Sequence, residues 1–289
     1  MENMKKYAFP LAALLFAACN SGEETTTTQI QEPVATILEY TPAPGQFING
    51  TMAEFDHVAS AADACSYAAN RIASNNWVSL GGWGGRIVAA FAEPVPNTGG
   101  YDLYVKGNQF DTSSEPGIVW VSQDANGDGA PNDTGSEYDN AETIRGYKIT
   151  YTRPAEADAP VAWSDNAGGS GTIDRVKEHT QAYYPEWLGE QFTFEGTRLP
   201  DNIGKAGEKW TMEPFAWGYA DNYSASDRTG MTNRLRISDA VTADGAPANL
   251  AQVDFIMVQT GVNAKAPLIG EVSTEVSGIG CYRTVTKKQ

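Results

Sequence analysis

Short apolar runs, separated by clusters of glycine, asparagine, aspartate and proline, make up most of the chain from residue 34 onward. Runs of this length between such turn signals are typical of β-strands. Almost no helical stretch stands between them, so the pattern predicts an all-β protein, an antiparallel sandwich or barrel in one domain. The expected strands are Val34–Tyr40, Arg86–Phe91, Tyr101–Val105, Gly117–Ser122, Tyr147–Thr152, Phe192–Gly196, Arg234–Ile237, Val253–Thr260 and Ser273–Ile279. The segment Ala155–Gly171 has the composition of a loop.

One segment has helical periodicity. Thr51 and Glu54 match a capping box, and apolar residues follow at helical spacing from Phe55 to Ile72. The pattern predicts one N-terminal α-helix that ends near Ala73 and packs on a sheet. His57 falls on its polar side, where solvation is the expected role.

The first residues have the pattern of a lipoprotein signal peptide. Lys5 and Lys6 precede the apolar stretch Tyr7–Phe16, and two alanines then precede Cys19. The apolar stretch is too short to span a membrane, which takes about 20 residues. We therefore expect removal of residues 1–18 and lipidation of Cys19, which would attach the protein stably to a membrane.

Residues 19–33 are predicted to be a flexible tether, because the Thr-rich run Thr25–Thr28 offers little apolar surface to bury. Residues 34–284 then form the single ligand-binding domain. Glu23 and Glu24, just after the cysteine, resemble the surface-export signal of Bacteroidetes lipoproteins. This resemblance implies the outer membrane of a Gram-negative cell, with the protein facing the exterior.

The charge of the chain limits its partners. The formal net charge is −16, and removing the leader, which carries one net positive charge, leaves −17. Nucleic acids need a basic face, so the charge argues against them as partners. It also argues against adsorption to anionic lipid, so that membrane attachment must come from the acyl chains.

Two cysteines remain after Cys19 is assigned to the anchor. Cys65 and Cys281 could form one disulfide in an oxidising compartment, or they could be two separate buried thiols. The sequence favours neither alternative.

The clearest local motif is an Asp-rich loop. Asp124, Asn126 and Asp128 alternate and a glycine follows at the sixth position, as in the first half of an EF-hand loop that wraps Ca²⁺. Gly135 stands where the twelfth-position glutamate is expected, and Asp133 or Glu137 could replace it. The motif predicts a structural Ca²⁺ site, with a plain turn as the alternative.

Catalytic patterns are scarce. The only histidines are His57 and His179, which excludes a His-rich zinc site, and the nucleophile-elbow, zincin and P-loop motifs are absent. A carboxylate pair for glycoside hydrolysis stays open, because the required separation is spatial and no pair is singled out. We therefore expect a binding protein and not an enzyme.

Two aromatic clusters are the candidate ligand-binding residues. Aromatic side chains in loops offer rigid contact area to sugars and flat macrocycles. Packing in the core is the alternative, and it is favoured for Phe215 and Trp217. The ligand-binding candidates are Tyr183, Tyr184, Trp217, Tyr219, Asp221, Asn222 and Tyr223.

Several longer motifs, in order, resemble the C-terminal domain of Bacteroidetes "cell surface protein" lipoproteins. They are Gly81-Gly-Trp-Gly-Gly85, Ser114-Glu-Pro-Gly117, the Asp-rich loop, Gly135-Ser-Glu-Tyr138, Trp163-Ser-Asp-Asn166, Ser170-Gly-Thr-Ile-Asp174, Trp217-Gly-Tyr-Ala-Asp-Asn222, Ile237-Ser-Asp-Ala-Val241 and Gln259-Thr-Gly-Val-Asn-Ala-Lys265. The Glu-Pro-Gly half also resembles jelly-roll modules of secreted proteins, which implies a jelly-roll-like β-sandwich. The chain departs from the family where relatives carry a Trp-Tyr-Glu-Leu stretch, since Thr134 joins Gly135 directly. It also keeps only a tether where relatives often have extra N-terminal modules.

Some members of that family are encoded in vitamin B12 uptake loci, beside a TonB-dependent outer-membrane transporter. The resemblance therefore implies a surface lipoprotein that captures a corrinoid such as cobalamin and delivers it to such a transporter. A calcium-dependent glycan-binding jelly roll is the alternative, and a glycan hydrolase is the third.

Overall fold

The computed structural model describes residues 25–55, 58–132, 135–137 and 144–288. The chain is mostly β, and every pair of neighbouring strands in its sheets is antiparallel. This confirms the predicted all-β class. Within the described ranges no helix has the length and apolarity to cross a bilayer.

Two five-stranded sheets form the body. The first has the order β1 (Thr25–Pro33), β20 (Gly278–Lys288), β5 (Leu103–Lys106), β15 (Thr232–Leu235) and β14 (Arg228–Thr229). The second has the order β2 (Thr36–Thr41), β4 (Arg86–Pro96), β16 (Gln252–Thr260), β6 (Gly117–Ser122) and β7 (Gly135–Glu137). Early and late strands lie side by side in both sheets, as the jelly-roll-like sandwich requires.

The core lies between these sheets because their strands alternate inward and outward residues. Leu103 and Val105 of β5 share one hydrophobic cluster with Ile87 and Ala89 of β4. The same cluster takes in Val119 of β6 and both Ile256 and Val258 of β16.

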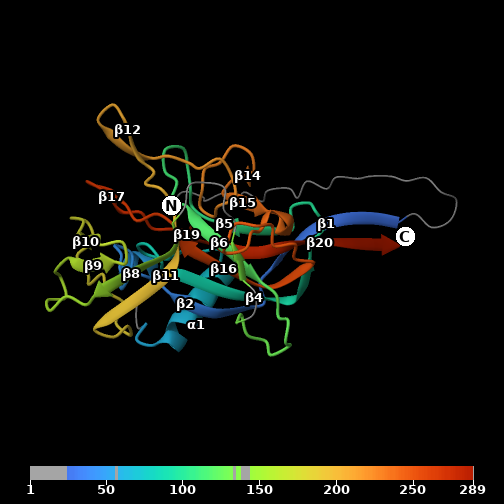
Figure 1. The fold of residues 1–289 in the computed structure, drawn as a ribbon, viewed down its shortest axis with the longest axis horizontal. Helices are drawn as coiled ribbons and strands as arrows, with labels where there is room; N and C mark the ends of the chain where they lie inside the picture. Colours follow the sequence, from blue (N-terminus) through green and yellow to red (C-terminus); the bar gives the residue numbers. More distant parts are fainter. Residues whose placement is uncertain (1–24, 56–57, 133–134, 138–143, 289) are drawn as a thin grey trace, which may run out of the picture.

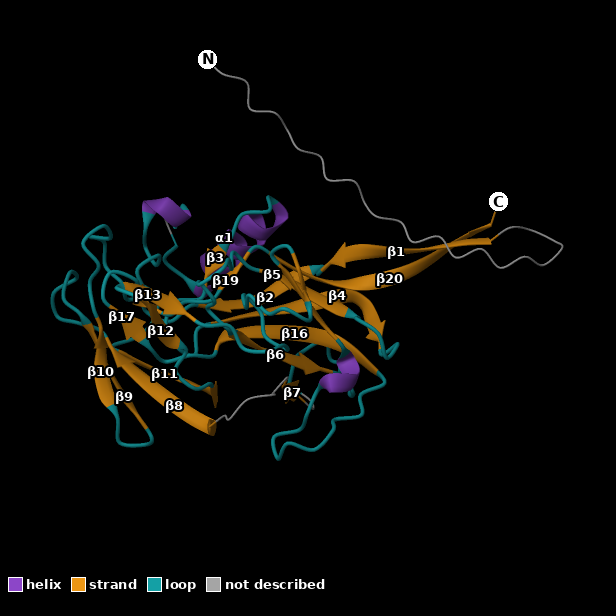
Figure 2. Ribbon diagram, turned by 90° about the horizontal axis from the view of Figure 1, so that it is seen from above, coloured by secondary structure: helices purple, strands orange, loops and turns teal. Residues whose placement is uncertain are grey.

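A third, four-stranded sheet lies at one end of the molecule (Figures 1 and 2). Its order is β10 (Ser170–Ile173), β9 (Val161–Asp165), β8 (Ile144–Thr152) and β11 (Gln191–Arg198). It covers a second cluster around Trp83 and Tyr147. The strands β9 and β10 correct the prediction of a loop over Ala155–Gly171, because Val161 and Ile173 supply the buried side chains there.

Three two-stranded pieces complete the sheet structure. They are β12 (Ile203–Ala206) with β13 (Lys209–Met212), β17 (Lys265–Ala266) with β18 (Gly270–Glu271), and β19 (Glu275–Val276) with β3 (Val78–Ser79).

The α-helix begins later than the capping box predicts. α1 spans Ala61–Ala73, and the Ser60 hydroxyl caps it by accepting from the Asp63 backbone N–H at 3.1 Å. Thr51–Ala53 form only a short 3₁₀ turn (η1), which stops at Glu54 because that residue has a left-handed φ of 52°. α1 packs its small residues against the core through Ala64 and Ala68. His57 lies outside the described residues.

The predicted tether over residues 19–33 is corrected from Thr25 onward, and residues 19–24 lie outside the described residues. Thr25–Pro33 form β1, which pairs along its whole length with β20. The polar threonines bury little apolar surface, but the backbone hydrogen bonds to β20 give the segment a defined structure. β20 pairs with β5 only over Gly278–Cys281, so β1 and the outer part of β20 extend from the body as a two-stranded ribbon (Figures 1 and 2).

The two cysteines are separate thiols. Cys65 lies half-buried on α1, whereas Cys281 is buried on β20, and neither forms a disulfide. Of the two alternatives that the sequence left open, the structure has two separate thiols, of which only Cys281 is fully buried.

The Gly81–Gly85 motif is explained by packing. A side chain at Gly85 would place its Cβ 1.7 Å from the Leu80 carbonyl oxygen, and one at Gly81 would place it 2.0 Å from the Ala43 carbonyl oxygen. Trp83 is buried and contacts Tyr147 edge-on, with ring centroids 4.8 Å apart. The motif thus joins the third sheet to the body.

Candidate ligand-binding site

The structure buries most of the predicted ligand-binding aromatics. Tyr183, Tyr184 and Tyr219 are each at most 3% exposed. The hydroxyls of the first two donate to the carbonyl oxygens of His179 and Gly189. They are core residues, which corrects the prediction that they contact a ligand.

Asp221 and Asn222 are buried as well, and this corrects their predicted role as ligand contacts. The Asn222 amide closes a loop, because it accepts from the Phe215 N–H and donates to the Phe215 carbonyl oxygen, both at 2.9 Å. The Asp221 carboxylate accepts from the backbone N–H groups of Asn108 and Glu275, each at 2.9 Å. Both side chains therefore shape the loop that precedes β14 and do not face solvent.

Trp217 lies on the surface of that same loop. It is 37% exposed and lines a pocket of about 400 Å³ together with Tyr101, Arg234, Arg236 and Asp239. Of the predicted residues, it alone lines this pocket. Tyr223 is half-buried elsewhere in the loop, with the Arg228 guanidinium 3.7 Å from its ring centroid. We call the pocket around Trp217 and Tyr101 the aromatic–arginine pocket.

The pocket is built from three segments. Arg234 and Arg236 alternate on and just after β15, so both point outward while Leu235 is buried between them. Their guanidinium carbons lie 4.3 Å and 4.4 Å from the ring centroid of Tyr101. This places one aromatic ring against two cations, an attractive arrangement.

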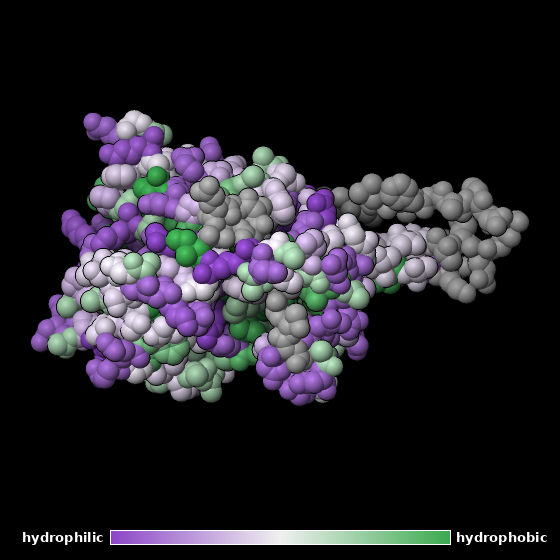
Figure 3. Space-filling model, viewed as in Figure 1, coloured by the Kyte–Doolittle hydropathy of each residue, from purple (hydrophilic) through white to green (hydrophobic). Residues whose placement is uncertain are grey.

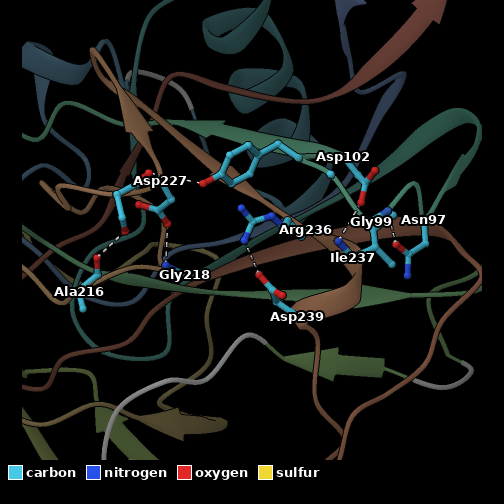
Figure 4. A network of polar contacts seen from close by, with 12 residues as sticks. Asn97, Gly99, Asp102, Ala216, Gly218, Asp227, Arg236, Ile237 and Asp239 are labelled. Atoms are coloured by element: carbon cyan, nitrogen blue, oxygen red, sulfur yellow. Dashed lines mark hydrogen bonds and ion pairs between the residues drawn. The ribbon is translucent and has the colours of Figure 1, made fainter.

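Backbone contacts hold the pocket walls in place (Figure 4). The buried Asp227 carboxylate accepts from the Gly218 N–H at 2.7 Å, which fixes the residue next to Trp217. Asp102 accepts from the Ile237 N–H at 3.1 Å, which fixes the residue next to Arg236. The pocket walls are therefore held by the buried carboxylates of Asp102 and Asp227, and Asp227 also lines the pocket.

The chemistry of the pocket suits a polar, flat-faced ligand. Trp217 supplies apolar contact area, and the two arginines supply planar hydrogen-bond donors that match carboxylates and other oxyanions. Arg236 already pairs with Asp239, with Nη1 and Oδ2 3.6 Å apart.

The sequence named Trp217 as a candidate but favoured core packing for it, and its exposed position corrects that preference. Tyr101, Arg234 and Arg236 were not indicated. The alternation of arginines around Leu235 was a usable signal, because it places both charges on one face of a predicted strand. Nothing local to Tyr101 signalled its role, since the pocket forms only where three distant segments meet.

The Asp-rich loop is exposed and closed by its own hydrogen bonds. Asp124 accepts from the backbone N–H groups of Gly127, Asp128 and Gly129 at 2.7 Å, 3.1 Å and 2.9 Å. Hydrogen bonds lower the pKa of Asp128, and the largest contribution comes from the Asn132 side chain. These contacts satisfy the carboxylates as a plain turn would, and Asp133 lies outside the described residues. Calcium binding by this loop stays a prediction.

No protein-family model matches this chain. A comparison with curated proteins also gave no match.

Proposed function

We propose that this chain is a lipid-anchored surface protein that binds a glycan in the aromatic–arginine pocket without cleaving it. The observation that carries the proposal is the juxtaposition of the exposed Trp217 with Tyr101 and two arginines in one pocket. Sugar rings stack on aromatic side chains, and guanidinium groups bind carboxylates in a bidentate manner. The favoured ligand is therefore an oligosaccharide with an acidic sugar unit, which a pocket of about 400 Å³ can hold.

The state of the two carboxylates in the pocket, Asp227 and Asp239, supports binding over catalysis. Hydrolysis needs two carboxyl groups that flank the scissile bond. In this pocket Asp227 is 3% exposed and is held by Gly218 and Ser224, while Asp239 pairs with Arg236. Both carboxylates that line the pocket are thus engaged by the protein itself.

Substitution of Trp217 by alanine tests the proposal. We expect the purified wild-type chain to bind acidic oligosaccharides on a glycan array. Trp217→Ala should weaken that binding about fivefold to tenfold, because stacking on an aromatic ring supplies about 1–1.4 kcal/mol. Trp210→Ala is the matched control, since Trp210 lies on the β12–β13 hairpin beside Lys205 and does not line this pocket. Equal binding by wild type and Trp217→Ala would show that the glycan sits elsewhere.

Corrinoid capture is the second candidate, favoured by a larger groove. It has a volume of about 770 Å³ and lies between α1 and the strands β1, β2, β5 and β20. Val34, Ile37, Ile72 and Ile279 give it an apolar lining suited to a bulky macrocycle. Delivery to a TonB-dependent transporter would then follow. Calorimetry with cyanocobalamin separates the candidates: heat of binding that is unchanged in Trp217→Ala assigns the function to this groove.

The lipid anchor is part of the proposal and rests on Lys5, Lys6 and Cys19, which lie outside the described residues. Labelled palmitate should be incorporated into the chain in cells and should be lost in Cys19→Ser. Label retained in that variant, or a wild-type chain found free in the periplasm, would contradict the anchor.

A further inference from the structure

Three carboxylates from distant segments meet inside the molecule. Glu115 precedes β6, Asp221 lies in the loop before β14, and Glu275 begins β19. One oxygen from each lies within 4.8 Å of the other two. We call these residues the inner carboxylate cluster. Within the described ranges, none of the three forms an ion pair with a lysine or arginine.

The cluster is closed off from water except at one edge. Asp221 and Glu275 are 0% and 1% exposed, whereas Glu115 is only partly buried. Ionised carboxylates are costly to bury unless they are paired or coordinate a metal.

Some of the oxygens have backbone donors. Asp221 accepts from Asn108 and Glu275, and Glu115 accepts from the Ser273 N–H at 3.0 Å. These bonds orient the carboxylates toward one another. They do not neutralise the charge, and Oε2 of Glu275 has no hydrogen-bond partner.

A fourth oxygen, from the uncharged side chain of Gln109, lies beside Asp221 at the cluster. Gln109 is 3% exposed, and its Oε1 has no hydrogen-bond partner. Its Nε2 donates to Asn233 Oδ1 at 2.8 Å, which leaves Oε1 turned the other way. Asp221 Oδ1 and Gln109 Oε1 converge over Gly107, 2.2 Å and 2.6 Å from where a Cβ would stand. A buried amide oxygen without a donor is a position that an ion or a water can complete.

We propose that Glu115, Asp221, Glu275 and Gln109 hold a Ca²⁺ ion that clamps three distant segments of the sandwich. All four donors are hard oxygens, which Ca²⁺ prefers. Ligands of one Ca²⁺ lie about 2.4 Å from it, so that opposite oxygens are at most about 4.8 Å apart. The spacing within the cluster meets this limit.

Electrostatics agree with the geometry. Burial and the nearby Asp221 raise the pKa of Glu115 to about 8, and burial raises the pKa of Asp221 to about 7. Burial and the other two carboxylates raise the pKa of Glu275 as well. A divalent cation would take the place of the protons that burial favours on these carboxylates.

The ion would also act on the aromatic–arginine pocket. Asp221 lies four residues after Trp217, in the loop closed by Asn222. Fixing Asp221 fixes the base of that loop. The ion site does not depend on the proposed glycan binding, and it can be tested without any glycan.

The test compares the melting temperature of the full chain in chelator and in 1 mM Ca²⁺. This concentration is about 100 times the dissociation constant of a Ca²⁺ site of moderate affinity. We expect wild type to melt about 5 °C or more higher with Ca²⁺. Glu115→Gln and Glu275→Gln should each lose most of this rise. Glu271→Gln, which changes a buried carboxylate outside the cluster, should keep it.

A second variant separates this cluster from the exposed loop. Asp124→Ala combined with Asp128→Ala should keep the Ca²⁺-dependent rise. A rise lost in that variant would place the ion in the Asp-rich loop and overturn the proposal. Calorimetric titration of wild type with Ca²⁺ guards against misfolded variants, because it needs no substitution. Binding of calcium to the chain is expected, and no heat of binding together with no melting shift overturns the proposal.

Discussion

Replacing Gly85 by alanine should cost about 4 kcal/mol or more of unfolding free energy. The added Cβ would lie 1.7 Å from the Leu80 carbonyl oxygen and 2.5 Å from the Ala43 backbone nitrogen. Those two atoms are joined by a hydrogen bond of 2.9 Å, so the methyl group would break this backbone contact. All of the nearest atoms belong to the backbone, so that the clash cannot be relieved by rotation of a side chain. Overpacking and a broken buried hydrogen bond act together here.

Gly100 supplies the matched control. A Cβ there has only the Thr98 hydroxyl nearby, at 3.4 Å. Gly100→Ala should therefore change stability by no more than about 0.5 kcal/mol. Urea unfolding followed by tryptophan fluorescence measures both variants, and similar midpoints for the two would show that the strands around Gly85 can move apart cheaply.

The stability of the protein should fall as pH rises, and Glu271 should account for about 2–3 kcal/mol of the fall between pH 5 and pH 8. Glu271 is 2% exposed, and burial raises its pKa from 4.5 to about 7. Between those values the folded state holds a proton that the unfolded chain has released, so rising pH favours unfolding. The contribution is complete below pH 4.5 and is lost once the pH passes about 7.

Glu271→Gln isolates this effect. The Glu271 Oε1 accepts from the Gln46 N–H at 2.7 Å, and Oε2 has no partner, so glutamine keeps the acceptor and removes the charge. The charge of Glu271 also acts on Glu115, Tyr151 and Tyr183. Urea unfolding at pH 5 to 8, with chelator throughout, should give a flatter profile for the variant. Parallel profiles would mean that Glu271 stays charged in the fold.

The strand pattern was predictable because apolar alternation follows directly from burial on one face. Gly117–Ser122 begins and ends as predicted, and Val253–Thr260 differs by one residue. The strands that were missed are polar, as in β1, or very short, as in the β12–β13 pair. They are held by backbone pairing, which leaves little trace in side-chain composition. The helix start was misplaced because Glu54 has a left-handed conformation that a capping-box pattern does not reveal.

The candidate sites were harder to predict, because burial depends on tertiary structure. Tyr219 and Trp217 lie two residues apart in one aromatic run, yet the first is fully buried and the second is 37% exposed. The inner carboxylate cluster brings together residues separated by more than fifty positions along the chain. No local spacing connects Glu115, Asp221 and Glu275.

The ribbon of β1 and β20 forms a two-stranded arm that projects from the body. Seven residues of β20, Tyr282–Lys288, pair with β1 beyond the end of β5, which corresponds to a length of roughly 23 Å. If the chain is attached to a membrane ahead of Thr25, the two paired strands, and not a single flexible strand, would connect the anchor to the body. The arm would hold the body away from the lipid headgroups and limit the directions in which it can face, so that the anchor would aim the protein as well as retain it.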